Sequence, residues 1–351
     1  MSSRISFFSA TPLEYGGGYE AFVTDAVAQM MSDGIDAEII VPPLRQFKRI
    51  VQSLGLGQRF AHVVKDNNGC AHYVERLRRA SRLYVKNEPL DIVWVRMLGA
   101  WKQPVVGFHT PLETESLLRD AFYRSAAYRR LLRGSTLHFL SRSQVPAWVI
   151  GQPYFVVPNG VEVPPLESSV QTSVLRLIFV GRMTRQKGID LLNAALRSID
   201  VPFVCSVFGD GEMADCARAL EAAGLAKYYG AASRSRILGE MKHHDIILMP
   251  SRWENQPLAA LEALAQGTIP ISSRIGPFAE LLAEYPELQV DYEQPASVAQ
   301  AVRYIYGMKF AEREKLRAGL HEIAKRFDKR VVFRQLAVAI IESSDVQPRR
   351  N

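Results

Sequence analysis

Cysteine is scarce in this 351-residue sequence, which contains three: Cys70, Cys205 and Cys216. The number is odd and the spacing fits no metal-ligand pattern, which argues against a disulfide framework and against a structural metal site. Such a composition fits a reducing compartment. We therefore expect the protein to be cytoplasmic.

Long apolar runs are missing as well. No stretch approaches the roughly 20 apolar residues that a membrane-spanning helix needs. The polar residues Ser9, Thr11 and Glu14 interrupt the apolar start of the chain, which argues against a cleavable signal. The prediction is a soluble protein, or one that is peripheral at the inner face of the membrane.

Two motifs of cofactor and metal enzymes do not occur. The glycine run at 16–18 is not a Gly-x-Gly-x-x-Gly fingerprint, which counts against a nicotinamide or flavin enzyme. No Asp-any-Asp run offers carboxylates to a divalent ion. We therefore expect no metal and no resident cofactor.

Length and composition predict two α/β domains. At 351 residues and 48% hydrophobic composition, the chain is long enough to form two full cores. The composition becomes polar and proline-containing at 162–169, between two strand-rich halves, and we place the linker there. The predicted domains are residues 1–165 and 166–327.

The second half carries the most informative pattern. The apolar run 245–250 predicts a buried parallel strand, followed by a helix that begins near Pro257 and ends at Gly267. Glu254 then lies in the loop before the helix, and Glu262 lies within the helix. Because five residues of helix span about 7.5 Å, the two carboxylates can flank a ligand whose anionic part faces the helix N-terminus. A sugar nucleotide has this layout.

A basic loop precedes this segment in the chain. Residues 174–192 predict a strand, then a loop with Gly181, Arg182 and Lys187, then a helix. An arginine fork and a lysine point charge can compensate the charge of a diphosphate leaving group without a metal. The spacing alone also fits an ordinary solvated loop, but its place after a strand favours a phosphate site.

Further glycine turns follow predicted strands. The run 203–212 predicts a strand that ends at Gly209 and Asp210. Near the N-terminus, Gly17 and Gly18 precede a stretch of helical composition, where the backbone can approach a ligand closely. Each of these signals is weak alone, and their order along the chain gives them weight.

The first half contributes a histidine. Its predicted strands include 4–9, 91–96 and 104–109, and the last of them ends at His109. Ligands of open α/β sheets gather at the carboxyl ends of strands. His109 is therefore a candidate site residue.

In this order, the motifs resemble the retaining glycosyltransferases of the GT-B fold, of the family 4 type (glycosyl transferases group 1). Glu254 to Glu262 resembles the Glu, seven residues, Glu of that family, and 181–188 its Gly-Arg, four residues, Lys-Gly. Residues 16–20 and 158–161 resemble its Gly-Gly-any-Glu and Pro-Asn-Gly-Val segments. The resemblance covers most of the second half and only scattered motifs of the first.

The resemblance implies a GT-B architecture. This consists of two doubly wound, Rossmann-like α/β domains that face an interdomain cleft. The first domain lies on the acceptor side, and the second binds the nucleotide sugar. A last helix, at about 328–346, is expected to cross back to the first domain.

The resemblance also implies roles for the candidate residues. Arg182 and Lys187 hold the leaving diphosphate, Glu262 binds the ribose, and Glu254 approaches the donor sugar. His109 lies at the reaction centre. The other residues implied to contact the donor are Gly17, Gly18, Gly181, Gly209, Asp210, Asn255, Gln256 and Leu258.

One departure from the family concerns the residues after the first glutamate. Many members have Gly-Phe-Gly there, whereas this chain has Asn255, Gln256 and Pro257. Proline has no amide hydrogen to donate to a hydroxyl or a phosphate. The donor contacts at this point therefore differ from the family pattern.

The implied function is retaining, metal-independent transfer of a sugar from a UDP- or GDP-sugar to a hydroxyl of a glycan or lipid-linked acceptor. The pathway would be glycan, polysaccharide or glycolipid biosynthesis. Two alternatives stay open. One is a sugar-nucleotide epimerase of the same fold, and the other is a non-catalytic scaffold that binds nucleotide sugars.

Basic residues gather in the first half of this chain, whose net charge is +7. Between Leu117 and Leu132, arginines alternate with apolar and aromatic residues. This pattern fits an interfacial helix that touches anionic lipid, but it favours an ordinary amphipathic surface helix. No nucleic-acid-binding motif accompanies the charge, so nucleic acid is not an expected partner. The arginines are Arg119, Arg124, Arg129, Arg130 and Arg133.

Overall fold

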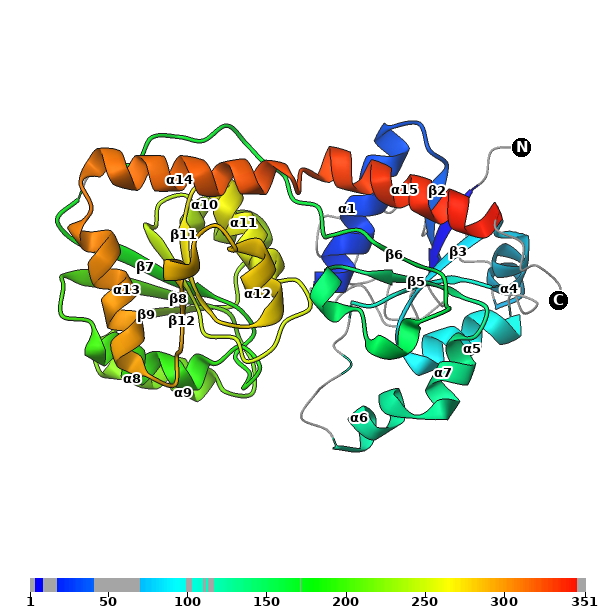
Figure 1. The fold of residues 1–351 in the computed structure, drawn as a ribbon, viewed down its shortest axis with the longest axis horizontal. Helices are drawn as coiled ribbons and strands as arrows, with labels where there is room; N and C mark the ends of the chain where they lie inside the picture. Colours follow the sequence, from blue (N-terminus) through cyan, green and yellow to red (C-terminus); the bar gives the residue numbers. More distant parts are fainter. Residues whose placement is uncertain are drawn as a thin grey trace. The chain divides into compact units, whose positions relative to one another are not determined.

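The computed structural model describes residues 4–8, 18–40, 70–98, 103–109, 112, 117–170 and 172–345, and it divides into two compact units (Figure 1). Unit 1 comprises residues 1–160 and 329–351, and unit 2 comprises residues 161–328. Each unit has its own sheet and its own buried apolar core.

The sheet of unit 1 has six strands in the order β2-β1-β3-β4-β5-β6, and all neighbouring pairs are parallel. The direction of winding reverses between β1 and β3. In open α/β sheets, ligands bind beside such a reversal, at the carboxyl ends of the strands. The strands are β1 Ile5–Phe8, β2 Ala37–Ile40, β3 Arg82–Lys86, β4 Val105–Gly107, β5 Thr136–Phe139 and β6 Tyr154–Val156.

Helices cover both faces of this sheet, and one of them comes from the end of the chain. Helix α15 packs beside α1, where Phe333 meets Phe22 with ring centroids 5.7 Å apart (Figure 1). Unit 1 is therefore assembled from two separate stretches of sequence. Its helices are α1 Gly18–Ser32, α4 Cys70–Arg79, α5 Pro89–Leu98, α6 Leu117–Arg124, α7 Ala126–Leu132 and α15 Lys329–Asp345.

The strand predicted at 91–96 is wrong, because these residues lie in helix α5. Pro89 is the first residue of the helix and Asp91 lies in its first turn, two features that favour a helix start. Ile92 and Val95, three residues apart, are fully buried, whereas Met97 is 62% exposed. Because the exposed face of this helix also carries apolar residues, its sequence resembles the continuous apolar run of a buried strand.

The single helix predicted between Leu117 and Leu132 is also wrong. The chain forms two helices, α6 and α7, which are separated by Ser125. The Ser125 hydroxyl caps α7 by accepting a hydrogen bond from the Tyr128 amide at 3.1 Å. Tyr123 and Tyr128 are buried and pack edge to face, with ring centroids 4.9 Å apart.

The sheet of unit 2 has six parallel strands in the order β12-β11-β10-β7-β8-β9. Counted from β7, this is the doubly wound order of dinucleotide-binding domains, and it reverses between β7 and β10. The loops after β7 and β10 therefore meet at the reversal. The strands are β7 Leu175–Val180, β8 Phe203–Phe208, β9 Lys227–Gly230, β10 Ile246–Met249, β11 Ile269–Ser273 and β12 Gln289–Val290.

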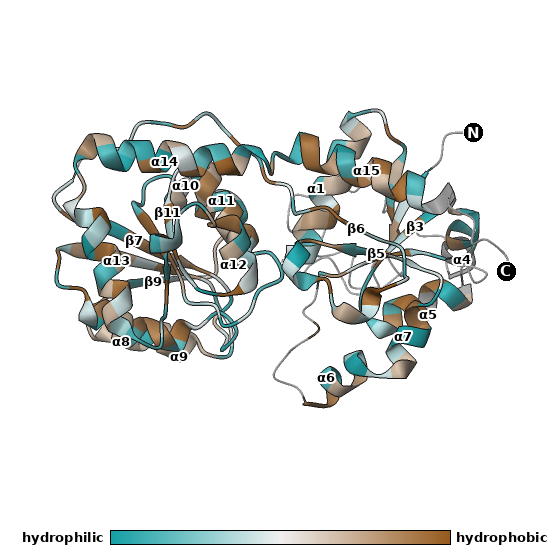
Figure 2. Ribbon diagram, viewed as in Figure 1, coloured by the Kyte–Doolittle hydropathy of each residue, from teal (hydrophilic) through white to brown (hydrophobic). Residues whose placement is uncertain are grey.

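Helix α11 follows β10 and has both predicted end signals. Pro257 precedes its first residue, and Gly267 ends it in the left-handed conformation, with φ 75°. It packs against α14, and Figure 2 shows hydrophobic and hydrophilic residues alternating along α14. The helices of unit 2 are α8 Leu192–Ser198, α9 Ala214–Ala222, α10 Arg234–Met241, α11 Leu258–Gln266, α12 Gly276–Leu281, α13 Pro295–Gly307 and α14 Phe310–Lys325.

The polar stretch after Gly160 lies on the surface of unit 2. Ser169 donates to Glu314 at 2.6 Å, and Arg317 donates to the carbonyl oxygen of Glu167 at 3.2 Å. Both partners belong to α14. Within the described helices, none combines the length and the hydropathy that crossing a bilayer requires.

Candidate active site

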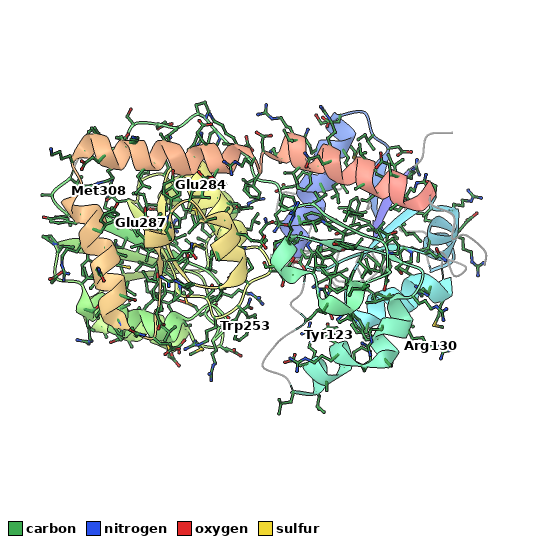
Figure 3. The ribbon with its side chains drawn as sticks, in the orientation of Figure 1. Tyr123, Arg130, Trp253, Glu284, Glu287 and Met308 are labelled. Atoms are coloured by element: carbon green, nitrogen blue, oxygen red, sulfur yellow. The ribbon has the colours of Figure 1, made fainter. Side chains whose placement is uncertain are left out.

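The loops after β7 and β10 are locked together at the reversal of the unit 2 sheet. Gly188 has φ 68°, and a Cβ at this position would collide with the carbonyl oxygen of Pro250. The Arg252 amide donates to the Gln186 carbonyl at 2.8 Å, and the Gln186 side chain donates to the carbonyl of Trp253, labelled in Figure 3, at 3.1 Å. The basic loop is therefore fixed against the loop that carries Glu254.

Two of the predicted site residues form an ion pair. Lys187 Nζ lies 2.5 Å from Glu254 Oε1, and the Ser251 hydroxyl donates to the same oxygen at 2.8 Å. The Glu254 side chain is 7% exposed and that of Lys187 is 19% exposed. A buried pair of this kind holds both side chains in place, because removing one partner leaves the other charge without compensation.

Arg182 lies in the same loop but outside this pair. Its guanidinium is exposed and reaches the Gln186 side-chain oxygen at 3.4 Å. No carboxylate among the described residues pairs with Arg182. Within the described residues, the charge of Arg182 is therefore not balanced by a neighbouring carboxylate.

The glycine turn after β8 packs against the same loop. Gly209 has φ 135°, and a Cβ there would collide with the carbonyl oxygen of Gly181. The Met183 amide donates to the Asp210 carbonyl at 2.9 Å, and the Asp210 side chain accepts from the Gly211 amide at 2.8 Å. The structure thus brings Gly209 and Asp210, which follow β8, against Gly181, which lies in the same loop as Lys187.

Glu262 lies in the second turn of α11 and has a partner that the sequence did not suggest. Arg234, the first residue of α10, donates from Nε to Glu262 Oε1 at 2.6 Å. The Glu262 side chain is 9% exposed and that of Arg234 is 39% exposed. The only sequence signal for Arg234 was its place as a basic residue after a strand, directly following Ser233, which caps α10. A carboxylate can accept about four hydrogen bonds, so this pair does not by itself exclude hydroxyl donors.

Asn255, Gln256 and Leu258 connect the two glutamates. Asn255 and Gln256 form the partly buried loop after Glu254, and Leu258 opens α11. The first amides of any α-helix have no partner inside the helix. The N-terminus of α11 therefore supplies donors and positive dipole charge next to the Lys187 pair.

A cavity of about 920 Å³ adjoins these residues along the carboxyl ends of β10, β11 and β12. Ser251 lines the cavity and also donates to Glu254, so the cavity borders the ion pair. Its other polar lining includes Arg252, Arg274, Glu287 and Gln300.

The candidate site of unit 1 is built around His109, just after β4. The Tyr84 hydroxyl lies 2.7 Å from His109 Nε2 and 2.5 Å from His138 Nδ1. His109 also packs on Tyr19 and Phe22, residues of α1, with ring centroids 4.9 and 4.3 Å apart. Gly18 is the first residue of α1, whereas the predicted Gly17 lies outside the described residues. Tyr84 and His138 escaped prediction because each stands in a strand that reads as ordinary core.

Burial keeps both imidazoles neutral. It lowers the pKa of His138 to about 4, and the hydrogen bond that the ring donates to the Val157 carbonyl raises the pKa by a smaller amount. Burial also lowers the pKa of His109 well below its usual range, and the neighbouring His138 and Lys86 lower it further. Neither ring therefore carries a charge at neutral pH.

These low pKa values predict acid sensitivity of unit 1. The unfolded chain binds a proton at His138 with a pKa near 6.5, and the folded chain at about 4, so stability is lost as pH falls through this range. We expect His138 alone to lower the unfolding free energy by about 2 kcal/mol between pH 7 and pH 5. Urea titrations at both pH values, followed by hydrogen exchange of β3 to β5 peptides, measure this. The variant His138→Gln should flatten the dependence, and an equal slope in both proteins would contradict the assignment.

Two doubly wound α/β units with parallel six-stranded sheets define the GT-B fold, as predicted. The Anabaena protein HepE, solved in complex with UDP-glucose, superposes with a TM-score of 0.71, covering 97% of this chain and 99% of that one, at 17% identity. Residues 168–327, nearly all of unit 2, match the family described as glycosyl transferases group 1.

Curated relatives match parts of the chain. An uncharacterized 41.2 kDa protein of the cps region of Klebsiella pneumoniae is 30% identical over 119 residues, 34% of this chain and 33% of its own length. A glycogen synthase of Mycobacterium tuberculosis is 26% identical over 184 residues, 49% of this chain and 44% of its own length. The matches thus span between a third and a half of these relatives.

Proposed function

We propose that the protein is a retaining, metal-independent glycosyltransferase that moves a sugar from a UDP- or GDP-sugar to an acceptor hydroxyl. The observation that carries the proposal is the pairing of Lys187 with Glu254 at the reversal of the unit 2 sheet. It puts a cation suited to phosphate beside a carboxylate suited to sugar hydroxyls, where α/β sheets bind ligands. The group 1 match of residues 168–327 supports the same reaction.

In this proposal the diphosphate binds between Lys187, Arg182 and the N-terminus of α11. An ammonium group has three donors, so Lys187 can keep its bond to Glu254 while it donates to phosphate oxygens. Arg182 is exposed and outside the ion pair, so its guanidinium can turn toward the ligand. These groups stabilise the charge that develops on the leaving diphosphate.

The two carboxylates bind different parts of the donor, the ribose and the transferred sugar. Glu262 accepts from the ribose hydroxyls, and Arg234 holds it in position. Glu254 accepts from a hydroxyl of the transferred sugar, held by Lys187 and Ser251. The UDP-glucose bound to HepE, a protein of the same fold, supports a donor of this class.

The reaction exchanges one bond at the anomeric carbon. The bond to the diphosphate oxygen breaks with its electron pair on that oxygen, and the acceptor oxygen forms the new bond on the same face. The acceptor proton passes to the leaving diphosphate oxygen, so no side chain needs to act as nucleophile. Charge stabilisation and positioning are then the main catalytic contributions of the protein.

The test is a panel of UDP- and GDP-sugars, with nucleotide release measured with and without acceptor extracts. Release that depends on the extract, with a product of unchanged anomeric configuration by NMR, supports the proposal. Release without any acceptor points to the epimerase, and calorimetric binding without release points to a scaffold. An inverted product would overturn the retaining assignment.

Chelation of divalent metals is expected to leave turnover unchanged, because cationic side chains compensate the charge of the diphosphate. Among the described residues, no cluster of His, Cys, Asp or Glu could hold a metal ion. Initial rates with and without EDTA should agree within about twofold. Loss of activity with EDTA that magnesium or manganese restores would remove Arg182 and Lys187 from this role.

We further propose that the acceptor is a glycan or a lipid-linked glycan, met at an anionic membrane surface. The support comes from α6 and α7. Leu117 and Leu118 are 87% and 86% exposed, and arginines lie exposed on the following turns. Arg119 is only partly exposed and pairs with Glu88 at 3.1 Å, so it is left out of the basic surface. The basic surface comprises Arg124, Arg129, Arg130 and Arg133; Arg130 is labelled in Figure 3.

Binding to anionic vesicles is expected to weaken as salt rises, because exposed charges are strongly screened. Replacing Arg129 and Arg130 by Gln should weaken sedimentation with these vesicles several-fold. The matched control replaces Arg197 and Arg303, exposed arginines of unit 2, and should have no effect. Equal sedimentation with neutral and anionic vesicles would leave an ordinary surface and favour a soluble acceptor.

A further inference from the structure

One arginine connects three loops at the carboxyl edge of the unit 2 sheet. Arg252, in the loop after β10, donates to both oxygens of Asp190 at 2.8 Å, from Nη1 to Oδ1 and from Nη2 to Oδ2. Its Nη1 also donates to the Arg185 carbonyl at 2.9 Å, and its Nη2 reaches Glu293, after β12, at 3.4 Å. Asp190 lies in a short 3₁₀ helix, Ile189–Leu191, which follows the basic loop after β7. The loops after β7, β10 and β12 therefore meet at one guanidinium.

The Arg252–Asp190 pair has the features that make an ion pair stronger than an ordinary surface pair. A guanidinium fork on a carboxylate forms two parallel bonds, which fix the orientation of the two groups as well as their distance. The two side chains are 20% and 32% exposed, so water screens the pair only in part. The hydrogen bonds from Arg252 lower the pKa of Asp190, which keeps the carboxylate ionised at neutral pH. The pair is thus a persistent link between the two loops.

The same two loops carry Lys187 and Glu254, the residues assigned to the diphosphate and the sugar. Asp190 follows Lys187 by three residues, and Arg252 precedes Glu254 by two. When a diphosphate binds, the Lys187 ammonium divides its hydrogen bonds between Glu254 and the phosphates, so its hold on the carboxylate weakens. The Arg252–Asp190 pair uses neither residue. It can therefore keep the loops in place at that moment.

We propose that Arg252 and Asp190 are positioning residues, which hold Lys187 and Glu254 at their working separation while the donor binds and reacts. The effect on turnover rests on the proposed function, whereas the link between the loops does not. Neither residue of the pair touches the donor in this role, since both act through the loops. A displacement of about 1 Å can cost about 100-fold in rate, so we expect the effect in kcat.

The first arm of the test needs no ligand and measures amide hydrogen exchange by NMR. Asp190→Asn removes the charge and one of the two acceptor oxygens. The amides of Lys187, Gly188 and Arg252, which donate to carbonyls of the basic loop at 2.8–3.1 Å, should then exchange at least about tenfold faster than in wild type. The amides of β7 and β10 should not change.

The matched control is Asp200→Asn. Asp200 accepts two bonds from Arg303 in the same unit, at 3.1 and 2.7 Å, but it lies before β8 and its side chain is 58% exposed. This control should leave loop exchange and turnover unchanged. Arg252→Lys is a second variant, which keeps the charge but loses the fork, and it should change loop exchange in the same direction as Asp190→Asn.

The second arm uses the sugar nucleotide that the panel identifies. Asp190→Asn and Arg252→Gln should each lower kcat about 30-fold, while the Kd of the bare nucleoside diphosphate changes by less than about threefold. The double variant should be no slower than the slower single variant, because the two residues act as one unit. A purely structural loss would instead reduce the fraction of protein that binds nucleotide, measured as the stoichiometry of calorimetric titration, and would spare kcat per binding site.

The two arms separate the link between the loops from the positioning role. Unchanged loop exchange in folded Asp190→Asn and Arg252→Lys overturns the link. Faster exchange with an unchanged kcat per binding site, or additive losses in the double variant, overturns the positioning role. If wild type turns over no sugar nucleotide, the proposed function fails and the positioning role fails with it, while a link shown by hydrogen exchange stands.

Discussion

Glu254→Gln is expected to lower kcat about 100-fold while the Kd of the bare nucleoside diphosphate changes by less than about twofold. The carboxylate lies beside the proposed sugar site, and contacts that position the sugar during bond cleavage act mainly on the transition state. The amide keeps the shape and an oxygen that can accept from Lys187 and Ser251. Steady-state kinetics and calorimetric titration with the nucleoside diphosphate measure the two effects.

Breaking the buried pair also affects folding, so the comparison needs folded protein. Urea titration of the variant verifies this, because an unpaired buried charge typically costs about 3–5 kcal/mol of stability. Glu322→Gln is the matched control. Glu322 pairs with Lys325 at 2.5 Å in the same unit, but its side chain is 65% exposed, and we expect kcat to be unaffected. Loss of nucleotide affinity in Glu254→Gln with kcat intact would contradict the assignment.

Glu262→Gln should produce the opposite pattern. We expect binding of the intact donor and of the bare nucleoside diphosphate to weaken alike by about 1.5–3 kcal/mol, because a charged acceptor for two hydroxyl donors is lost. This corresponds to a Kd about 10–150 times higher. Calorimetric titration of both ligands is the measurement. The kcat at saturating donor should fall much less than in Glu254→Gln.

Two further comparisons test the proposed contact of Glu262 with the ribose. The affinity difference between wild type and Glu262→Gln should be smaller for a 2′-deoxy or 3′-deoxy nucleoside diphosphate than for the parent ligand. Arg234→Gln should weaken binding less than Glu262→Gln, since Arg234 acts through the carboxylate in this proposal. If Glu262→Gln keeps full nucleotide affinity and Glu254→Gln loses it, the two roles have to be exchanged.

The donor-side loops were predictable because their chemistry is local in sequence. Gly181, Arg182 and Lys187 lie within seven residues after one strand, and Glu254 lies just after another. Parallel strands bring their carboxyl ends to one edge, so the two loops had to lie at the same edge of the sheet. The sequence could not show that Lys187 bonds Glu254, because this depends on the order of β7 and β10 in the sheet.

The residues that escaped prediction are those whose partners lie far away in sequence. Tyr84 meets His138 across 54 positions, and Arg234 meets Glu262 across 28. The first pair depends on the order and register of the strands and the second on the packing of α10 against α11, and neither leaves a local pattern in the sequence. The strand prediction at 91–96 failed for another reason, because the exposed face of helix α5 is apolar as well.

Helix α15 also has a consequence for how the chain is made. Phe333, Leu336 and Ile340 are fully buried in the core of unit 1, yet about 170 residues separate them from the rest of that unit. At about 5–20 residues per second, a ribosome needs roughly 10–30 s to synthesise the intervening segment. During this time Phe22 and its neighbours lack their cover, whereas unit 2 is completed without interruption. Unit 2 can therefore finish folding during synthesis, and unit 1 can only close after the ribosome has delivered the last helix.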